Sequence, residues 1–178
     1  QGKAQDGGPE AAVSGVSGLR GLSMAKEKPK TVVPKLRFPE FREAEGWSVK
    51  RLGGIAQFTS GGTPSKDEPK YWSGNIPWIS ASSMYETLIA NSELKVTSLA
   101  IGNGTRLAPK GNVLILVRGS MLFNRVPIGI ATIDVAFNQD VKALALVDEV
   151  EKEFVLHQLI ASSSRMPINE TGIGAGKI

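Results

Sequence analysis

The chain has 178 residues, of which 41% are hydrophobic and 21% are charged, and its formal net charge at pH 7 is +4. These values are typical of one ordinary globular domain and exclude wholesale disorder. The sequence has no run of about 20 apolar residues, which is the length that a membrane-spanning helix needs. The sequence has no cysteine and one histidine, which excludes disulfides and thiolate metal sites and leaves little room for histidine chemistry. We therefore expect a cytoplasmic protein.

Charge is distributed unevenly along the sequence. Residues 1–37 hold seven Lys and Arg against three Asp and Glu, so residues 38–178 are balanced. Within the balanced part, residues 50–125 carry nine basic groups against four acidic ones, and residues 134–178 carry four against seven. We expect the folded domain to have a basic side that can meet phosphate and an acidic side that avoids it.

The first segment, residues 1–37, has no hydrophobic periodicity and is rich in Gly, Ala, Ser and Lys. Such a segment buries too little apolar area to offset the entropy of ordering it, so we expect a flexible basic arm. The character changes at Phe38. Three aromatic residues, Phe38, Phe41 and Trp47, lie close together in the sequence, and we expect them to anchor the start of the fold. We therefore predict a single domain that comprises residues 38–178.

Short apolar runs bounded by Gly, Pro, Asn or Asp predict strands through the middle of the domain. Near the C-terminal end, Glu151–Ser162 has apolar residues at helical spacing, which predicts an amphipathic helix. Acidic residues at its N-terminal end would interact favourably with the positive end of the helix dipole. The predicted strands are Ile76–Ser80, Val113–Val117, Val126–Ile133 and Val141–Val147.

A polar loop follows a short apolar element at Val49–Phe58. Its paired glycines let backbone N–H groups approach an anion, its hydroxyls can donate to phosphate oxygens, and its lysine adds positive charge, so it could position a phosphate. A plain surface turn is the alternative, since Gly-Pro-Ser loops are common. The candidate residues are Ser60, Gly61, Gly62, Thr63, Ser65 and Lys66, followed by Tyr71 and Trp72.

A second polar group lies further along the chain. Arginine can form paired hydrogen bonds with guanine or phosphate, and Asn or Gln can pair with adenine, so these side chains suit the reading of base edges. In the alternative interpretation, the first arginine caps a strand and the Asn-Gln pair closes a hairpin. The candidates are Arg118, Asn124, Arg125, Asn138 and Gln139.

Two other classes of function stay open on the residues alone. Asp134, Asp140 and Lys142 resemble the permissive pattern by which many nucleases hold a metal ion, which would make the protein a small metal-dependent nuclease. A protein-interaction module with an incidental basic face is the other. The sequence has no Asn-Pro-Pro-aromatic segment of the kind that adenine methyltransferases carry, so it has no visible base-flipping active site.

Taken in order, these motifs resemble the target-recognition domain of a type I restriction-modification specificity subunit. The similarity runs from about Phe38 to Lys177, and several motifs occur in the same order and at similar separations. The matching segments are Gly46–Phe58, Ser60–Ser65, Tyr71–Ser80, Leu107–Leu114, Val117–Gly119 and Phe137–Leu144.

The resemblance implies a non-catalytic reader of double-stranded DNA without a cofactor of its own. In that family, two such domains are joined by long helices and each reads half of a bipartite target. Methyltransferase subunits that use S-adenosylmethionine and a motor-nuclease subunit are the expected partners; ATP and magnesium would also belong to the partners, and no membrane partner is expected. The chain holds one recognition domain, without the connecting helix and the second recognition domain, so we interpret it as a half-subunit or a fragment.

We therefore predict an α+β fold, with a single target-recognition domain built on a bent, mostly antiparallel sheet with flanking helices. Loops at one edge of the sheet would enter the major groove. The loop at Ser60–Lys66 would position the DNA backbone, and Arg118–Arg125 with Asn138 and Gln139 would lie at or near the bases.

Overall fold

A computed structural model describes residues 30–171 and 174–178. The chain divides into two units, residues 1–49 and residues 50–178, which are described separately. Most of the predicted arm, residues 1–29, lies outside the described residues.

In the first unit, two short strands, β1 (Thr31–Val32) and β2 (Trp47–Ser48), pair antiparallel. The guanidinium of Arg37 donates to the carbonyl oxygens of Phe41 (3.1 Å) and Glu45 (2.9 Å), which fixes the chain between the two strands. The aromatic residues expected as anchors, Phe38, Phe41 and Trp47, are all more than half exposed, so within this unit they do not form a core.

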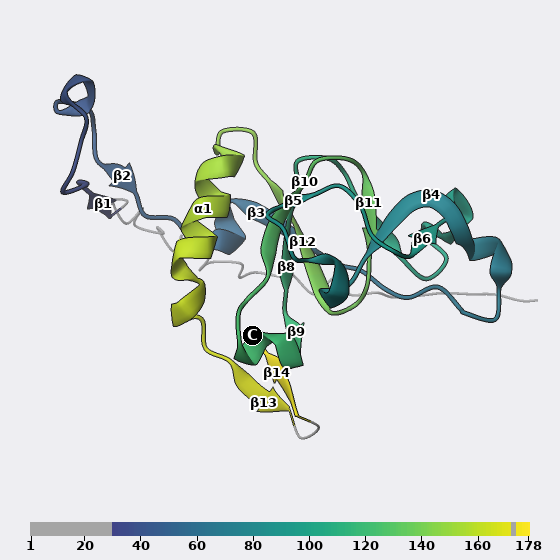
Figure 1. Ribbon diagram of the computed structural model, residues 1–178. Coiled ribbons are helices and arrows are strands. Elements are labelled where there is room, and N and C mark those ends of the chain that lie inside the picture. Colours follow the sequence, from purple (N-terminus) through teal and green to yellow (C-terminus); the bar gives the residue numbers. More distant parts are fainter. Residues whose placement is uncertain (1–29, 172–173) are drawn as a thin grey trace, which may run out of the picture. The chain divides into compact units, whose positions relative to one another are not determined.

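The second unit is built around a five-stranded sheet in the order β3-β12-β8-β10-β5 (Figure 1). All its pairs are antiparallel except β10 with β5. The strands are β3 (Ala56–Ser60), β12 (Val141–Leu146), β8 (Val113–Leu116), β10 (Ile128–Ala131) and β5 (Leu88–Ile89), and the short 3-10 helix η2 (Leu52–Gly54) precedes β3.

A second sheet of four strands has the order β6-β4-β11-β7. Its longest strand carries a bulge, because Trp72 and Ile76 both pair with Val96 and the residues between them leave the ladder. Ser73 adopts a left-handed φ of 60° in this bulge, and Gly74 leaves no room for a Cβ against the carbonyl of Val96. The strands are β6 (Lys95–Val96), β4 (Trp72–Ile79), β11 (Val135–Phe137) and β7 (Arg106–Ala108).

The C-terminal part supplies the one α-helix of the described residues and a small third sheet. Helix α1 (Lys152–Ser162) buries Val155 and Leu156, while Phe154 and Ile160, two apolar residues of the predicted helix, are exposed. The third sheet has the order β13-β14-β9, with β13 (Asn169–Thr171), β14 (Ala175–Lys177) and β9 (Arg118–Gly119).

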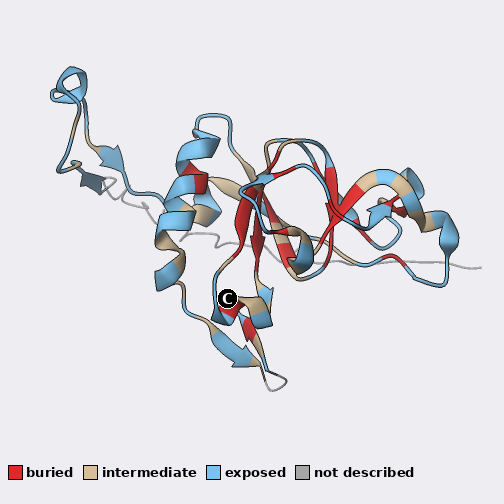
Figure 2. Ribbon diagram, in the orientation of Figure 1, coloured by how far each residue is buried: buried red, intermediate tan, exposed pale blue. Residues whose placement is uncertain are grey.

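Strand β8 shows how the layers pack. Side chains alternate between the two faces of a strand, and Leu114 and Leu116 pack toward the four-stranded sheet with Phe137, while Val113 packs toward Leu156 of α1. Because both faces are covered, all four residues of this strand are buried (Figure 2), which explains its uninterrupted apolar sequence.

The α+β class with mostly antiparallel strands is confirmed. Every pair of named strands in the described residues is antiparallel except β5 with β10 and β4 with β11. The four predicted strands and the predicted helix correspond to β4, β8, β10, β12 and α1, with ends that differ by a few residues. The strands that were not predicted are two or three residues long, apart from the five-residue β3, which the short apolar element at Val49–Phe58 supplies.

Across the described residues, no helix is both long enough and apolar enough to cross a membrane.

Replacing Leu114 by Ala is expected to lower the free energy of unfolding by about 2–5 kcal/mol, because Leu114 is fully buried and its truncation leaves a cavity in the core. Urea unfolding of residues 1–178 measures this loss. The matched control is Leu99→Ala, because Leu99 is 58% exposed and its truncation should change stability by less than about 0.5 kcal/mol. Equal losses for the two variants would contradict the layer assignment.

Candidate functional site

Two tryptophans of β4 hold the polar loop that follows β3. The indole Nε1 of Trp78 donates to the carbonyl oxygen of Gly62 at 3.0 Å, and Nε1 of Trp72 donates to that of Ser65 at 2.9 Å. The two rings meet edge to face, with centroids 5.5 Å apart, a favoured aromatic geometry. The N–H group of Trp72 thus holds the loop in shape, and the expected contact of Trp72 with DNA stays a prediction.

The same loop closes against the end of β11. The backbone N–H of Gly62 donates to the carbonyl oxygen of Phe137 at 2.9 Å, and the hydroxyl of Thr63 donates to Oε1 of Gln139 at 2.8 Å. Gly61 is packed so closely that a Cβ would overlap the carbonyl oxygens of Phe137 and Asn138. The two polar groups predicted from the sequence, 76 residues apart at Thr63 and Gln139, are thus brought together.

A third segment supports this contact. The buried hydroxyl of Thr105 donates to the carbonyl oxygen of Phe137 at 2.9 Å, so that oxygen accepts two hydrogen bonds. Gly104, with a φ of 116°, lies against buried Pro64, where a Cβ would be 2.7 Å from the proline Cα. No sequence pattern marks Thr105 or Gly104, because their role depends on the pairing of β7 with β11.

Asn138 is a turn residue and is 7% exposed. Its Oδ1 accepts from the backbone N–H of Asp140 at 3.1 Å, its Nδ2 donates to Oδ2 of Asp140 at 3.3 Å, and its backbone N–H donates to the carbonyl of Ile79. This is the Asx-turn geometry. The side-chain amide of Asn138 therefore forms hydrogen bonds within the turn, and the expected contact of Asn138 with a base stays a prediction. The turn joins β11 to β12 in a different sheet, so it closes no hairpin.

Gln139 next to it is exposed. Since Oε1 accepts the Thr63 hydroxyl, the Nε2 group is left to donate outward.

Arg118 is connected to the same turn. The backbone N–H of Val117 donates to the carbonyl oxygen of Asp140 at 2.8 Å, and Nη1 of Arg118 lies 3.8 Å from Oδ1 of Asp140. The side chain of Arg118 is 53% exposed and that of Asp140 is 27% exposed. Arg118 is also paired through β9 with Lys177 of β14, so its backbone is fixed while its guanidinium reaches solvent.

Other basic groups lie near this turn. Lys66 was predicted as a DNA contact from the sequence, whereas Arg106 and Lys142 were not. Lys142 of β12 pairs in register with Ser60 of β3, and its Nζ donates to the Ser60 hydroxyl. Arg106 of β7 is exposed and stands opposite Phe137 in the ladder. Lys66 in the loop is exposed as well, and the Ser65 Oγ accepts from the N–H of Asp67 at 3.3 Å. Strand pairing, which the sequence does not reveal, places Lys142 beside Ser60 and Arg106 beside Phe137.

Asn124 and Arg125 belong to a different part of the unit. They follow the 3-10 helix η6 (Ser120–Phe123), and Arg125 donates through Nη2 to the carbonyl oxygen of Met84 at 2.9 Å. Its guanidinium also lies 6.0 Å from the ring centroid of Tyr85. Arg125 therefore stabilises the contact between two loops, while the side chain of Asn124 is exposed at the end of η6.

Tyr71 lies in the 3-10 helix η3 (Pro69–Tyr71) with its ring 5.1 Å from Nζ of Lys70. Lys70 in turn forms a 3.0 Å ion pair with Glu68, and this hydrogen bond and the attraction of the carboxylate raise the pKa of Lys70. The group is exposed, and its charge at neutral pH is already complete. Tyr71 thus packs within this turn.

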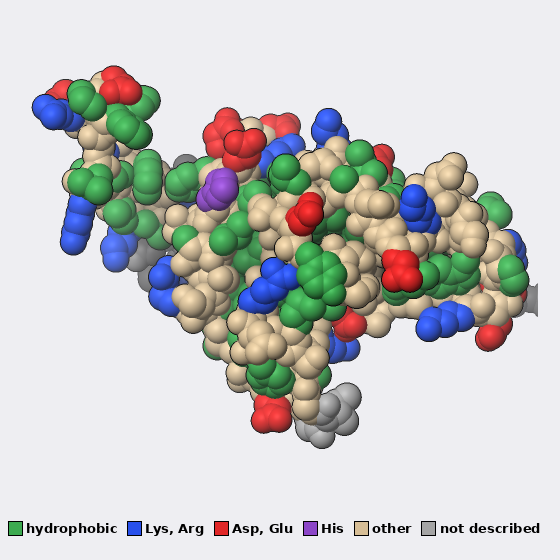
Figure 3. Space-filling view, viewed as in Figure 1, with side chains coloured by type: hydrophobic (Ala, Val, Ile, Leu, Met, Phe, Trp, Pro, Cys, Tyr) green, Lys and Arg blue, Asp and Glu red, His purple; other side chains and the backbone are tan. Residues whose placement is uncertain are grey.

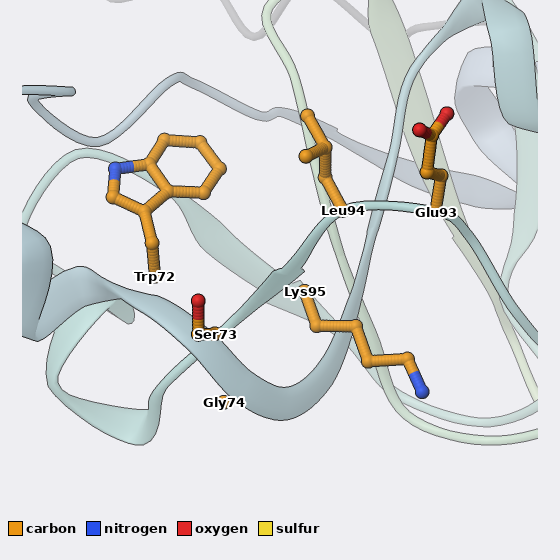
Figure 4. A pocket seen from close by; sticks show the side chains of 6 residues that line it. All are labelled: Trp72, Ser73, Gly74, Glu93, Leu94 and Lys95. Atoms are coloured by element: carbon orange, nitrogen blue, oxygen red, sulfur yellow. The ribbon is translucent and has the colours of Figure 1, made fainter.

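A shallow pocket of about 310 Å³ lies beside the bulge of β4 (Figure 4). The side chains of Glu93 and Lys95 point away from the indole of Trp72, so the pocket has no converging polar groups and is not a convincing ligand site. Its lining residues are Trp72, Ser73, Gly74, Glu93, Leu94 and Lys95.

The nuclease pattern is not assembled by this fold. Asp134 and Asp140 lie at opposite ends of β11; Oδ1 of Asp134 accepts from the N–H of Lys110 at 2.8 Å, and Asp140 faces Asn138 and Arg118. Among residues 30–171 and 174–178, no group of three His, Cys, Asp or Glu side chains is gathered as metal ligands would be.

Acidic side chains gather above the start of α1 on the face drawn in Figure 3, whereas Lys and Arg side chains lie singly among neutral ones. The acidic residues around the start of the helix, Asp148, Glu149, Glu151 and Glu153, are all exposed. Lysine and arginine therefore form no continuous patch on this face.

Comparison with known proteins places this geometry in context. Residues 44–178 match the family described as "Type I restriction modification DNA specificity domain". The specificity subunit of the type I restriction enzyme EcoR124I/EcoR124II from Escherichia coli is 35% identical over 122 residues, which cover 67% of this chain and 30% of that protein. The MjaIX specificity subunit from Methanocaldococcus jannaschii is 31% identical over 131 residues, covering 66% and 29% respectively.

Among solved structures, the S subunit of a type I restriction-modification system from M. genitalium superposes with a TM-score of 0.51 at 16% identity, over 83% of this chain and 34% of that one. This similarity supports the fold. The chain spans less than a third of the length of the two curated relatives.

Gly61→Ala is expected to lower the free energy of unfolding by about 1–3 kcal/mol, because the added Cβ would push the loop away from the backbone at Phe137. Thermal or urea unfolding measures the loss. Gly53→Ala is the control, since nothing lies within 4 Å of its Cβ position. If Gly61→Ala lowers the free energy of unfolding no more than Gly53→Ala does, the loop does not close on β11 as described.

Proposed function

Because the chain belongs to the family of type I restriction modification DNA specificity domains, we propose that it recognises a specific sequence in double-stranded DNA as part of a specificity subunit. The observation that carries the proposal is the junction of three distant segments, Ser60–Lys66, Val117–Arg118 and Asn138–Asp140, through hydrogen bonds and one ion pair. The junction is braced by buried groups and carries exposed donors. This combination suits a surface that must hold its shape while contacting a duplex.

The donors fall into two classes by chemistry. Lys66, the hydroxyl of Ser65 and the loop backbone suit phosphate oxygens, which position a protein on DNA without reading sequence. Arg118 and the free Nε2 of Gln139 suit base edges in the major groove, where arginine pairs with guanine and glutamine with adenine. Arg106 and Lys142 add positive charge beside them.

We further propose that the chain itself is not an enzyme. S-adenosylmethionine, ATP and magnesium would be bound by partner subunits, a methyltransferase subunit and a motor-nuclease subunit, in the cytoplasm. The recognition domain would comprise residues 38–178. Because the chain covers less than a third of the related specificity subunits, one such domain would read one half of a bipartite target.

Binding of the 178-residue chain to a pool of random duplexes, followed by sequencing of the retained fraction, tests the proposal. We expect a common short motif to be enriched. Binding should weaken with salt with a log–log slope of about −4 to −5 if four to six basic groups contact phosphate. Binding that is insensitive to salt would favour a protein-interaction module, and magnesium-dependent cleavage of plasmid that Asp140→Ala abolishes would favour a nuclease.

Arg118→Gln is expected to weaken binding to the selected duplex by about 1–3 kcal/mol and to affect a scrambled duplex less, because a paired contact with a base is lost. Lys66→Ala should weaken both duplexes alike and reduce the salt slope by about 1. Fluorescence anisotropy over a salt series measures both effects.

Lys152→Ala is the charge-matched control, since Lys152 begins α1 and lies outside the proposed contacts. If Arg118→Gln weakens the selected and the scrambled duplex equally, Arg118 is a phosphate contact and its assignment to a base is wrong.

A further inference from the structure

A carboxylate lies within the proposed DNA surface. Asp140 stands beside Arg118 and Gln139, and Lys142 follows it by two residues. Nearby phosphates would repel this negative charge, so it would weaken binding on a surface that only had to hold DNA. Its position therefore calls for another explanation.

Asp140 is held rigidly. Its backbone N–H donates to Oδ1 of Asn138 at 3.1 Å, its carbonyl oxygen accepts from the N–H of Val117 at 2.8 Å, and its Oδ2 accepts from Nδ2 of Asn138 at 3.3 Å. Oδ1 is left facing the guanidinium of Arg118. The buried Asn138, which the sequence suggested as a base reader, thus serves to fix this carboxylate.

Arg118 is held only loosely in comparison. Its Nη1 lies 3.8 Å from Oδ1 of Asp140, longer than a hydrogen bond, and its side chain is 53% exposed. An exposed ion pair of this kind contributes little to stability. The pair is thus strong enough to bias the direction of the guanidinium and weak enough to be exchanged for a base.

We propose that Asp140 is a positioning residue that makes Arg118 selective, an inference that rests on the proposed function. Asp140 competes with phosphate oxygens for the guanidinium, so Arg118 adds little to binding of unrelated DNA. When the correct base is present, the planar guanidinium gains a paired contact that outweighs this competition. Discrimination then comes from weakening the wrong complex as well as from stabilising the right one.

Asp140→Asn tests this, because an asparagine keeps a carbonyl oxygen for Nδ2 of Asn138 and leaves both backbone bonds intact. In the 178-residue chain, we expect binding to the scrambled duplex to tighten by about two- to fivefold. The salt slope on that duplex should become steeper by about 1. Binding to the selected duplex should improve less, so the ratio of the two affinities falls.

The same substitution in the Arg118→Gln background separates this role from a general charge effect. If Asp140 acts through Arg118, it should change the affinity ratio little there. Asp148→Asn is the charge-matched control, since Asp148 is exposed in the segment between β12 and α1, and it should leave the ratio unchanged. Urea unfolding confirms that each variant is folded.

The inference is overturned if Asp140→Asn leaves the ratio of affinities unchanged, or changes it equally with and without Arg118. In both cases the wild-type chain still prefers its selected duplex, and the proposed function stands. If the wild-type chain shows neither a selected motif nor salt-dependent binding, the proposed function fails and the inference fails with it.

Discussion

The site depends on one backbone carbonyl, that of Phe137 at the end of β11. It accepts hydrogen bonds from the N–H of Gly62 and the hydroxyl of Thr105, and the loop reaches it only because Gly61 has no side chain. Since a buried acceptor without partners is costly, these contacts hold the loop after β3 to the strand end. The proposed DNA contacts of the loop, among them Lys66, take their position from this attachment.

The layered packing explains why the attachment occurs at this point. The chain leaves β11 in the four-stranded sheet and enters β12 in the five-stranded sheet, and the residues between them must turn from one layer to the other. Asn138 and Asp140 satisfy the turn with their own side chains, which leaves Gln139 exposed at its tip. The exposed Gln139 therefore lies on a turn that connects two sheets. Asn124 and Arg125 lie on a different loop, which Arg125 holds through its hydrogen bond to the carbonyl oxygen of Met84.

The sequence predicted the parts of this fold that follow from local pattern. The uninterrupted apolar run at Val113–Leu116 and the helix at Lys152–Ser162 lie close to where periodicity placed them. The loop at Ser60–Lys66 was recognised from its composition, but its partners were not, because the pairing of β3 with β12 and of β7 with β11 is set by contacts between distant residues. For the same reason, burial of Asn138 and the use of Trp72 as a brace could not be predicted: their residue types suit both DNA contact and turn stabilisation, and only tertiary packing decides between them.

The braced junction carries four of the basic groups of the domain, Lys66, Arg106, Arg118 and Lys142, as the proposed recognition of DNA requires. Photo-cross-linking tests this most directly: the 178-residue chain is irradiated with a selected duplex that carries 5-iododeoxyuridine, and the attached peptides are identified by mass spectrometry. We expect cross-links to the segments around Ser60–Lys66, Arg118 and Gln139. Cross-links confined to α1 or to the loop around Arg125 would show that DNA meets another surface and would contradict the account.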